Sequence, residues 1–136
     1  MNTDLVMDLT EVNAITEKVI GCLFQVSNAL GGGFLEKVYE NAAAIEIAKS
    51  GLNVRQQFPI EVKYDGAIVG QFYADLLVAD QVMVEMKAIR LLEDVHTAQC
   101  LNYLRATNLP VCLLVNFYRP KLEIKRLIAS QAWLRH

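Results

Sequence analysis

Residues 72–87, with the sequence FYADLLVADQVMVEMK, constrain the fold of this chain more strongly than any other segment. They have the pattern of two short strands joined by a tight connection. Because side chains alternate between the two faces of a strand, Glu85 and Lys87 share one face of the second strand, and Asp75 can meet them from the first. Two carboxylates and an ammonium group on a mostly apolar hairpin are costly unless another charge compensates them. A divalent cation would do so, because hard cations bind carboxylate oxygens.

A purely structural interpretation of the same residues stays open, in which Glu85 and Lys87 form an ion pair on a half-solvated sheet. The metal interpretation, unlike the structural one, requires a strand register that puts both carboxylates on one face of the hairpin. Residues opposite each other in an antiparallel pair share a face, so Asp75 must lie opposite Glu85. A two-residue turn on Asp80-Gln81 would put the two carboxylates on opposite faces. We therefore predict an odd-numbered loop of three or five residues around Asp80.

The composition predicts one α/β domain over residues 1–136. Hydrophobic residues make up 54% of the chain, and the mean hydropathy of +0.26 is high for a soluble protein. The sequence has no apolar run of about 18 residues, so we predict a sheet buried beneath helices and no membrane partner. The acidic N-terminus lacks a signal-peptide pattern, and the three cysteines have neither an even count nor metal-site spacing. Together these features predict a cytoplasmic protein with reduced core thiols.

The charge distribution is more informative than the net charge of −2, which does not by itself indicate nucleic-acid binding. Residues 1–68 contain five Lys or Arg and nine Asp or Glu, whereas residues 69–136 contain eight and six. The second half therefore has a slight excess of positive charge, and we expect a modest basic surface there.

Hydrophobic periodicity predicts the order helix, helix, three-strand meander, helix, strand and strand. Residues 111–117 are almost all apolar, as in a strand buried on both faces, and Pro59 indicates an edge position or a bulge in the first strand. The fold class is therefore α/β with a mixed sheet. The predicted helices span residues 8–30, 34–50 and 91–107, and the predicted strands span residues 54–63, 68–78, 82–88, 111–117 and 122–128.

The second predicted helix contains a candidate site residue, Glu36, beside its apolar stripe. That stripe predicts the face that packs on the core. An acidic side chain in the first turn interacts favourably with the helix dipole, which is the structural interpretation of Glu36. The functional interpretation places Glu36 over the acidic hairpin, and the spacing does not decide between the two. The predicted core stripe consists of Leu35, Val38, Ala42 and Ile45.

The third predicted helix carries a polar stripe, His96, Gln99 and Tyr103, next to an apolar one. The helix must pack across the meander to bury its apolar side, so we expect Gln99 and Tyr103 to face the same site as Lys87. A lone histidine near a helix start is more often structural, so His96 is the weaker candidate. The predicted core stripe consists of Leu91, Val95, Ala98, Leu101 and Leu104.

The segment from Gly33 through Glu36 to Tyr39 resembles the signature of the GxxExxY family. The stretches AIVGQFYADLLV, VMVEMKAI, DVHTAQCLNYLRAT and LLVNF follow in the order and spacing of that family, over residues 10–128. The family is placed in the PD-(D/E)XK nuclease-like superfamily. The resemblance implies a restriction-endonuclease-like core, with helices packed on a central mixed sheet.

Carried over residue by residue, the resemblance implies a metal site and a catalytic lysine. Asp75 matches the isolated acid of the superfamily, and residues 85–87 match its ExK motif. Glu36 matches the acid of the first core helix. These matches imply that Asp75 and Glu85 bind Mg²⁺ or Mn²⁺, with Glu36 and a backbone carbonyl near Met86 as further ligands. Lys87 would then orient or deprotonate the attacking water.

Gln99 and Tyr103 resemble the QxxxY element of some branches, which implies hydrogen bonds to phosphate oxygens or to Lys87. The implied activity is metal-dependent hydrolysis of phosphodiester bonds in nucleic acid, in DNA rather than RNA. The alternative is a catalytically silent nuclease-fold domain that binds or scaffolds within a larger complex. A homodimer or a larger complex stays open in either case, because a nuclease-like fold does not establish activity.

Overall fold

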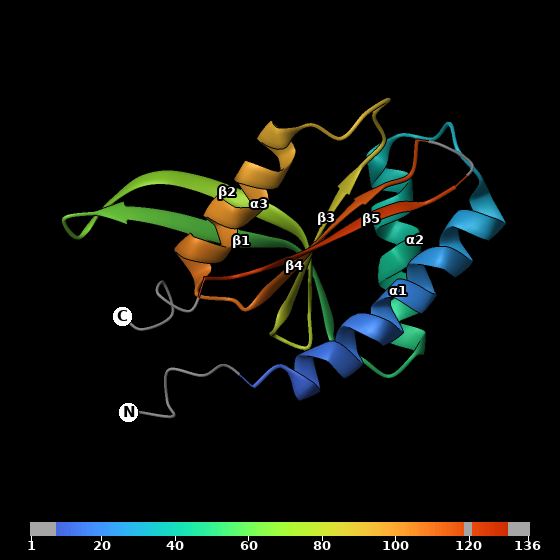
Figure 1. Ribbon diagram of the computed structural model, residues 1–136, viewed down its shortest axis with the longest axis horizontal. Coiled ribbons are helices and arrows are strands. Elements are labelled where there is room, and N and C mark those ends of the chain that lie inside the picture. The colour runs from blue at the N-terminus through green and yellow to red at the C-terminus, as the bar shows by residue number, and fades with distance from the viewer. Residues whose placement is uncertain (1–7, 119–120, 131–136) are drawn as a thin grey trace.

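The computed structural model describes residues 8–118 and 121–130. A five-stranded sheet in the order β1-β2-β3-β4-β5 forms its centre. Helices α1 and α2 cover one face of the sheet and α3 crosses the other (Figure 1). The helices are α1 (Thr10–Leu30), α2 (Glu36–Lys49) and α3 (Asp94–Thr107), and the strands are β1 (Val54–Tyr64), β2 (Ala67–Val78), β3 (Val82–Lys87), β4 (Val111–Asn116) and β5 (Glu123–Ile128). Among these helices, none is long and apolar enough to cross a membrane.

The order and type of every described element match the prediction, and the mixed α/β fold class is confirmed. Strands β1, β2 and β3 form an antiparallel meander, β3 pairs with β4 in parallel, and β4 pairs with β5 antiparallel. Strand β1 with Pro59 is an edge strand, as predicted. Strand β4 is buried at every position, because helices cover both of its faces.

The connection between β2 and β3 confirms the predicted register. Leu77 lies opposite Met83 and Val78 opposite Val82, which leaves a three-residue loop, 79–81. Ala79 and Asp80 take left-handed backbone conformations with φ of 52° and 58°. The loop is held by an ion pair between Asp80 and Arg55, and by a 2.8 Å hydrogen bond from the Ala79 N–H to the Asn53 carbonyl. The odd loop length keeps both acids of the hairpin on one face.

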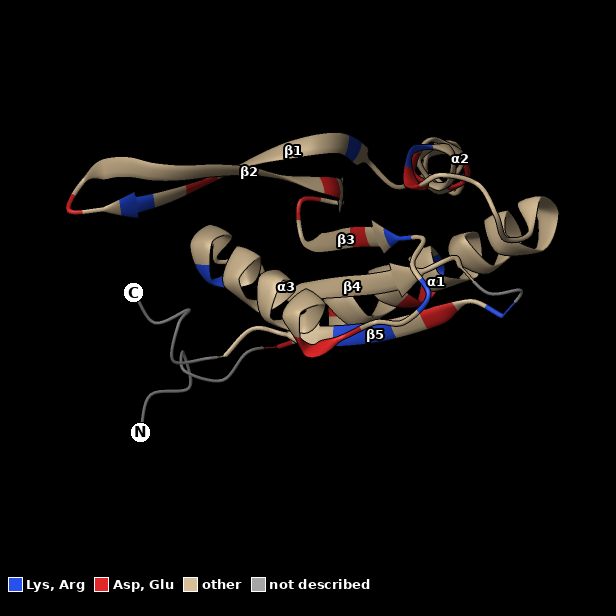
Figure 2. Cartoon of the chain, turned by 90° about the horizontal axis from the view of Figure 1, so that it is seen from above, with Lys and Arg blue, Asp and Glu red and all other residues tan. Residues whose placement is uncertain are grey.

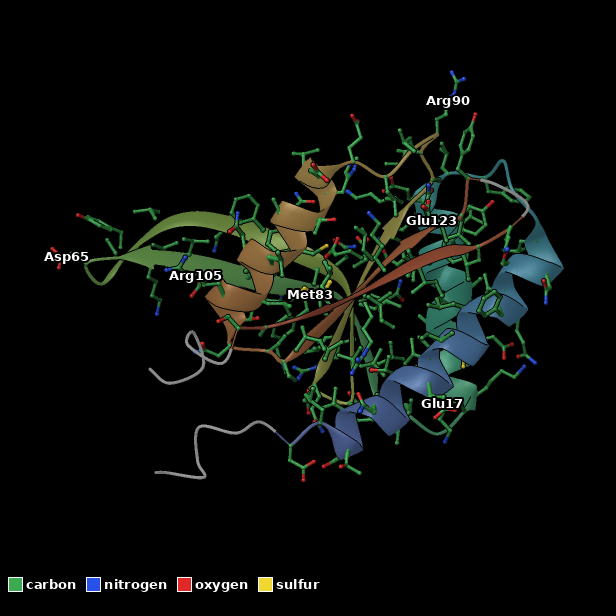
Figure 3. All side chains as sticks on the ribbon, in the orientation of Figure 1. Glu17, Asp65, Met83, Arg90, Arg105 and Glu123 are labelled. Atoms are coloured by element: carbon green, nitrogen blue, oxygen red, sulfur yellow. The ribbon has the colours of Figure 1, made fainter. Side chains whose placement is uncertain are left out.

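The sheet separates two hydrophobic cores. In β3, Val82, Val84 and Met86 point toward α1 and α2, whereas Met83 points toward α3. Met83 lies at the centre of the molecule, beneath α3 (Figure 3). This is the alternation predicted for the strand, and it places Glu85 on the α3 side of the sheet, since Glu85 is two residues from Met83.

The predicted core face of α2 is wrong. Leu35 is 81% exposed, Val38 and Ile45 also face outward, and Ala42 is only half-buried. Tyr39 fills the space above the sheet instead, and small alanine side chains let α2 pack along α1. Sequence periodicity could not separate these two stripes, because both are spaced as a helix face requires. The buried face consists of Tyr39, Glu40, Ala43, Ala44 and Ile47.

A buried tyrosine fixes the connection between α1 and α2. Gly31 ends α1 with φ of 70°, and a Cβ on Gly32 would lie 2.8 Å from the Tyr118 carbonyl oxygen, so only glycine fits there. The Tyr39 hydroxyl donates a 2.6 Å hydrogen bond to the Gly31 carbonyl and accepts one from the Phe34 N–H at 3.2 Å. Tyr39 therefore positions the first turn of α2, which carries Glu36.

Replacing Tyr39 with phenylalanine should lower the free energy of unfolding by about 1–3 kcal/mol, because two backbone groups lose their partner. Urea denaturation followed by circular dichroism measures this difference. Tyr73→Phe is the matched control, since Tyr73 is exposed on β2 and its loss should be within about 0.5 kcal/mol. Equal stability of the Tyr39→Phe and wild-type proteins would contradict this role of the hydroxyl.

Candidate functional site

Two carboxylates replace regular strand pairing at the point where β2 and β3 diverge. The paired residues run from Val78 and Val82 to Leu76 and Val84, and Asp75 and Glu85 are the next residue on each strand. Here the Asp75 carboxylate accepts a 2.8 Å hydrogen bond from the Met86 N–H. The Glu85 carboxylate accepts one from the Asp75 N–H at 3.3 Å. Each acid thus binds the backbone of the opposite strand, and the two acids lie side by side.

Burial and mutual repulsion make it unfavourable for both carboxyl groups of this acidic pair to be ionised. Glu85 is only 5% exposed, and burial followed by the charge of Asp75 raises its pKa to about 9. The pKa of Asp75 is also raised, first by burial and then by the charges of Glu40 and Glu36, against the hydrogen bond from Met86. The pair therefore holds a proton at neutral pH unless a cation binds. Strand β3 carries this acid and, two residues later, a basic residue (Figure 2).

Lys87 lies at the end of β3, half-buried and on the same face as Glu85. Its positive charge lowers the pKa of both Glu85 and Cys100, so the ammonium group is close to the acidic pair. The Lys87 carbonyl accepts a 2.8 Å hydrogen bond from the Phe117 N–H of the neighbouring chain segment. Asn116, which pairs with Lys87 across the sheet, binds both backbone groups of Ile89 and fixes the chain that leaves β3.

Glu36 lines a depression of about 420 Å³ together with Asp75 and Glu40. The structure thus places Glu36 over the acidic hairpin, as the functional interpretation requires. Phe34, Leu35, Lys37 and Ala88 complete the lining.

Glu40 is a site residue that the sequence analysis missed. It is buried, and it accepts hydrogen bonds from Gln57 Nε2 at 2.8 Å, Gln56 Nε2 at 2.8 Å and Lys37 Nζ at 3.1 Å. Its position four residues after Glu36, on the same helix face, was the available signal. The hydrophobic stripe assigned to α2 pointed to another face and hid it.

Gln57 was missed as well. Its Nε2 lies between the two acids, 2.8 Å from Glu40 Oε1 and 3.5 Å from Asp75 Oδ1. Gln57 has φ of 54° in the middle of β1, a conformation that costs energy for any residue other than glycine. The strained backbone directs this side chain into the site, and a sequence pattern carries no signal for it.

On α3, the structure brings Tyr103 to the acids. The pKa of Tyr103 is raised, first by burial and then by the charges of Glu85, Cys100 and Asp75. Gln99, one turn earlier, lies on the wall of the groove between α3 and the β1–β2 hairpin, which Tyr103 also lines. His96 instead closes a capping box, in which its Nδ1 accepts a 2.9 Å hydrogen bond from the Glu93 N–H. His96 is therefore structural.

The predicted core stripe of α3 is wrong, because only Leu104 among its members is buried. Val95 is 66% exposed and Leu91 precedes the helix in exposed chain, whereas Cys100, Tyr103 and Leu104 are buried. The helix is rotated so that Tyr103 packs toward the sheet. Its ring centroid lies 5.6 Å from that of Phe72 on β2. Cys100 and Cys112 face each other beneath Glu85 as buried thiols, which confirms the prediction of unpaired core cysteines.

The predicted metal ligands are only partly assembled. Across residues 8–118 and 121–130, no three His, Cys, Asp or Glu side chains are grouped closely enough to hold a metal ion. Asp75 and Glu85 come together, whereas Glu36 is exposed in the first turn of α2. The predicted set of three acids is therefore not preformed, because Glu36 starts an exposed helical turn while the other two sit in the sheet.

Comparison with known proteins gives a family for this chain. The sequence matches no curated protein. Among solved structures, it is similar to an alkaline exonuclease (LHK-Exo) from Laribacter hongkongensis, with 15% sequence identity and a TM-score of 0.48 over 98% of this chain and 77% of that one. The family model of the PD-(D/E)XK nuclease superfamily matches residues 13–127, which is most of the sequence. The chain therefore belongs to the PD-(D/E)XK nuclease superfamily.

Proposed function

We propose that this protein is a metal-dependent nuclease that hydrolyses phosphodiester bonds in nucleic acid, with DNA preferred over RNA. The observation that carries the proposal is the pair of adjacent, largely buried carboxylates, Asp75 and Glu85, with the positive charge of Lys87 beside them. A structural ion pair between Glu85 and Lys87 would not need Asp75 at the same place. Membership of the nuclease superfamily supports this assignment.

The residues of the site fit a divalent ion, and dependence on such an ion is typical of this superfamily. Asp75 and Glu85 provide hard oxygen donors, and their raised pKa values are what a bound cation would reverse. Mg²⁺ keeps several waters when few carboxylates bind it, so two acids with a backbone carbonyl near Met86 suffice, and Glu36 can act through water. Bound Mg²⁺ or Mn²⁺ supplies an activated water and stabilises charge on the phosphate.

The other residues position the substrate and the water. Lys87, whose positive charge acts on Glu85, would orient or deprotonate the attacking water. The raised pKa of Tyr103 keeps its hydroxyl protonated at neutral pH, so it can donate to a phosphate oxygen. Gln99 is the second donor that we assign on α3, for substrate that reaches the groove. Gln57 Nε2 donates to both Glu40 and Asp75 and thereby bridges them as a positioning residue.

Within the superfamily, we assign the chain to the GxxExxY family. The signature residues have distinct places that support this assignment: Gly33 takes φ of 104° in the connection, Glu36 lines the acidic depression, and Tyr39 holds the connection through its hydroxyl. We further propose that residues 1–136 form one domain that acts in the cytoplasm, since its three cysteines are buried free thiols.

Cleavage of labelled single- and double-stranded DNA and RNA with Mg²⁺ or Mn²⁺ tests the proposal. Asp75→Asn should lower the cleavage rate by about 10²-fold or more, because it removes a negative ligand and leaves the charge on the phosphate unstabilised. Calorimetric titration with Mn²⁺ should show weaker binding to the same variant.

Asp80→Asn is the matched control, because it makes the same chemical change in the exposed loop of the same hairpin. Its cleavage rate should equal that of the wild type. Mn²⁺ binding without cleavage of any substrate would instead identify the catalytically silent binding domain. A protein that neither binds Mn²⁺ nor cleaves any substrate would show that the proposed metal site does not exist.

A further inference from the structure

A groove of about 1240 Å³ runs between α3 and the β1–β2 hairpin, next to the acidic site. This volume exceeds the range of about 300–1,000 Å³ that is usual for small-molecule pockets, so it suits a segment of a polymer. The hairpin extends past α3 and forms one side of the groove (Figure 1). Arg105 lies on the side of α3 next to the hairpin (Figure 3). The hairpin contributes Phe58, Ile60, Val62 and Phe72, and α3 contributes Gln99, Asn102 and Tyr103.

The groove and the acidic pair meet at Tyr103 on α3. Tyr103 lines the groove, and the charges of Glu85 and Asp75 act on its hydroxyl. Phe72 lines it as well and precedes Asp75 by three residues in β2. A chain that lies in the groove therefore leads to the acidic pair.

We propose that this groove binds an unpaired, single-stranded segment of nucleic acid and delivers it to the acids, with Phe72 as the stacking platform for a base. The inference rests on the proposed function for its substrate class. It goes beyond that function by naming the strand state of the substrate and the surface that selects it.

Phe72 is built as a platform. Its side chain is 43% exposed, while its ring contacts Tyr103 with a centroid distance of 5.6 Å. A Cβ on Gly70 would lie 3.2 Å from a ring carbon of Phe72, so the ring lies close above this glycine. One part of the ring is thus fixed by the protein and another is open to the groove. A rigid, half-exposed aromatic ring is the feature that binds unpaired bases by stacking.

The polar lining favours nucleic acid over an apolar peptide. Gln99 and Asn102 present amide groups that can donate to and accept from base edges or phosphates. Lys63 and Arg105 add positive charge for the phosphate backbone, against one acid, Glu61. Bases inside a duplex are already stacked on their neighbours, so a stacking groove selects a strand whose bases are free.

Fluorescence anisotropy with labelled, unstructured single strands and matching duplexes, in Ca²⁺, tests the inference. The wild-type protein should bind the single strand more tightly than the duplex. Phe72→Leu keeps an apolar side chain against Tyr103 but removes the aromatic face, so single-strand affinity should fall by about fivefold or more. Phe72→Tyr should retain the affinity, because it retains the ring.

Phe24→Leu is the matched control, since Phe24 is 44% exposed on α1, on the other side of the sheet. It should bind as the wild type does. Unchanged affinity of the Phe72→Leu protein, equal losses in both leucine variants, or equal affinity for duplex and single strand would each overturn the inference.

Cleavage of bis(p-nitrophenyl) phosphate with Mn²⁺ separates the groove from the proposed function, because this small ester does not need the groove. If the groove and the function both hold, Phe72→Leu cleaves the ester normally and Asp75→Asn does not. If the ester is cleaved but Phe72 is dispensable for strand binding, the groove is rejected and the nuclease stands. If single-strand binding depends on Phe72 but the protein cleaves neither the ester nor an oligonucleotide, the proposed role of the groove stands. The proposed nuclease activity is then rejected.

Discussion

Metal-free protein with Glu85→Gln should be more stable than the wild type by about 3 kcal/mol at pH 7, since one pKa unit is worth about 1.4 kcal/mol. Folding raises the pKa of Glu85 from 4.5 to about 9. At pH 7 the native protein keeps a proton on Glu85 that the unfolded chain releases, and this difference opposes folding. Glutamine is neutral at every pH and nearly isosteric, so it removes the opposition.

The direction of the pH dependence follows from the same shift. Because the folded pKa lies above the unfolded one, the stabilising contribution of protonated Glu85 is complete below about pH 4.5 and is lost as the pH rises toward 9. Between these values the loss should approach about 1.4 kcal/mol per pH unit. Urea denaturation in EDTA at pH 5, 6, 7 and 8 measures it.

Glu61→Gln is the control for this experiment, because Glu61 is exposed on β1 and should leave the pH dependence unchanged. The same slope of stability against pH in the Glu85→Gln and wild-type proteins would refute the raised pKa of Glu85 in the folded state. Adding Mg²⁺ at about 1,000 times its Kd should reverse the order of stability, since such a ligand stabilises a protein by about 4.1 kcal/mol and the variant lacks one carboxylate.

Replacing Lys87 with methionine should lower the rate of strand cleavage by about 10²–10⁴-fold, the range for loss of a group that handles a proton or orients the nucleophile. Mn²⁺ affinity should be unchanged or higher, because Asp75 and Glu85 remain and a competing positive charge is gone. Methionine has a similar unbranched shape, so the half-buried position keeps its packing. Single-turnover cleavage and calorimetric titration on the same protein separate the two effects.

Lys121→Met is the matched control, with the same change at an exposed residue before β5. It should cleave at the wild-type rate. If Lys87→Met loses Mn²⁺ affinity in parallel with activity, Lys87 supports the carboxylates and does not act on the water. If it retains the wild-type rate, the lysine has no part in the reaction.

The positions that the sequence predicted best are those constrained by more than one requirement. The β2–β3 hairpin has an alternating pattern and two acids that must share a face, and these together excluded a two-residue turn. Strand β4 has so many apolar residues that only a position buried on both faces suits it. Element boundaries followed from the glycines and prolines between the periodic segments.

The predictions that failed concern which face of a helix packs on the sheet. In α2 and α3, two overlapping stripes satisfied helical spacing, and packing of Tyr39 and Tyr103 against other elements chose between them. Glu40, Gln57 and Asn116 were missed for a related reason. The hydrogen bonds that join Glu40 to Gln56 and Gln57, and Asn116 to Ile89, span 16 to 27 residues of sequence, so a local pattern does not predict these contacts.

The backbone at Gln57 and Pro59 also affects how one molecule can meet another. An edge strand such as β1 exposes a row of N–H and C=O groups that can template a strand from a second chain. Pro59 lacks an N–H, and the left-handed conformation of Gln57 turns its peptide groups out of the row. The half of β1 nearest the acids is thus a poor template for intermolecular strand addition. The left-handed backbone that directs Gln57 toward Glu40 therefore also disfavours aggregation through this edge of the sheet.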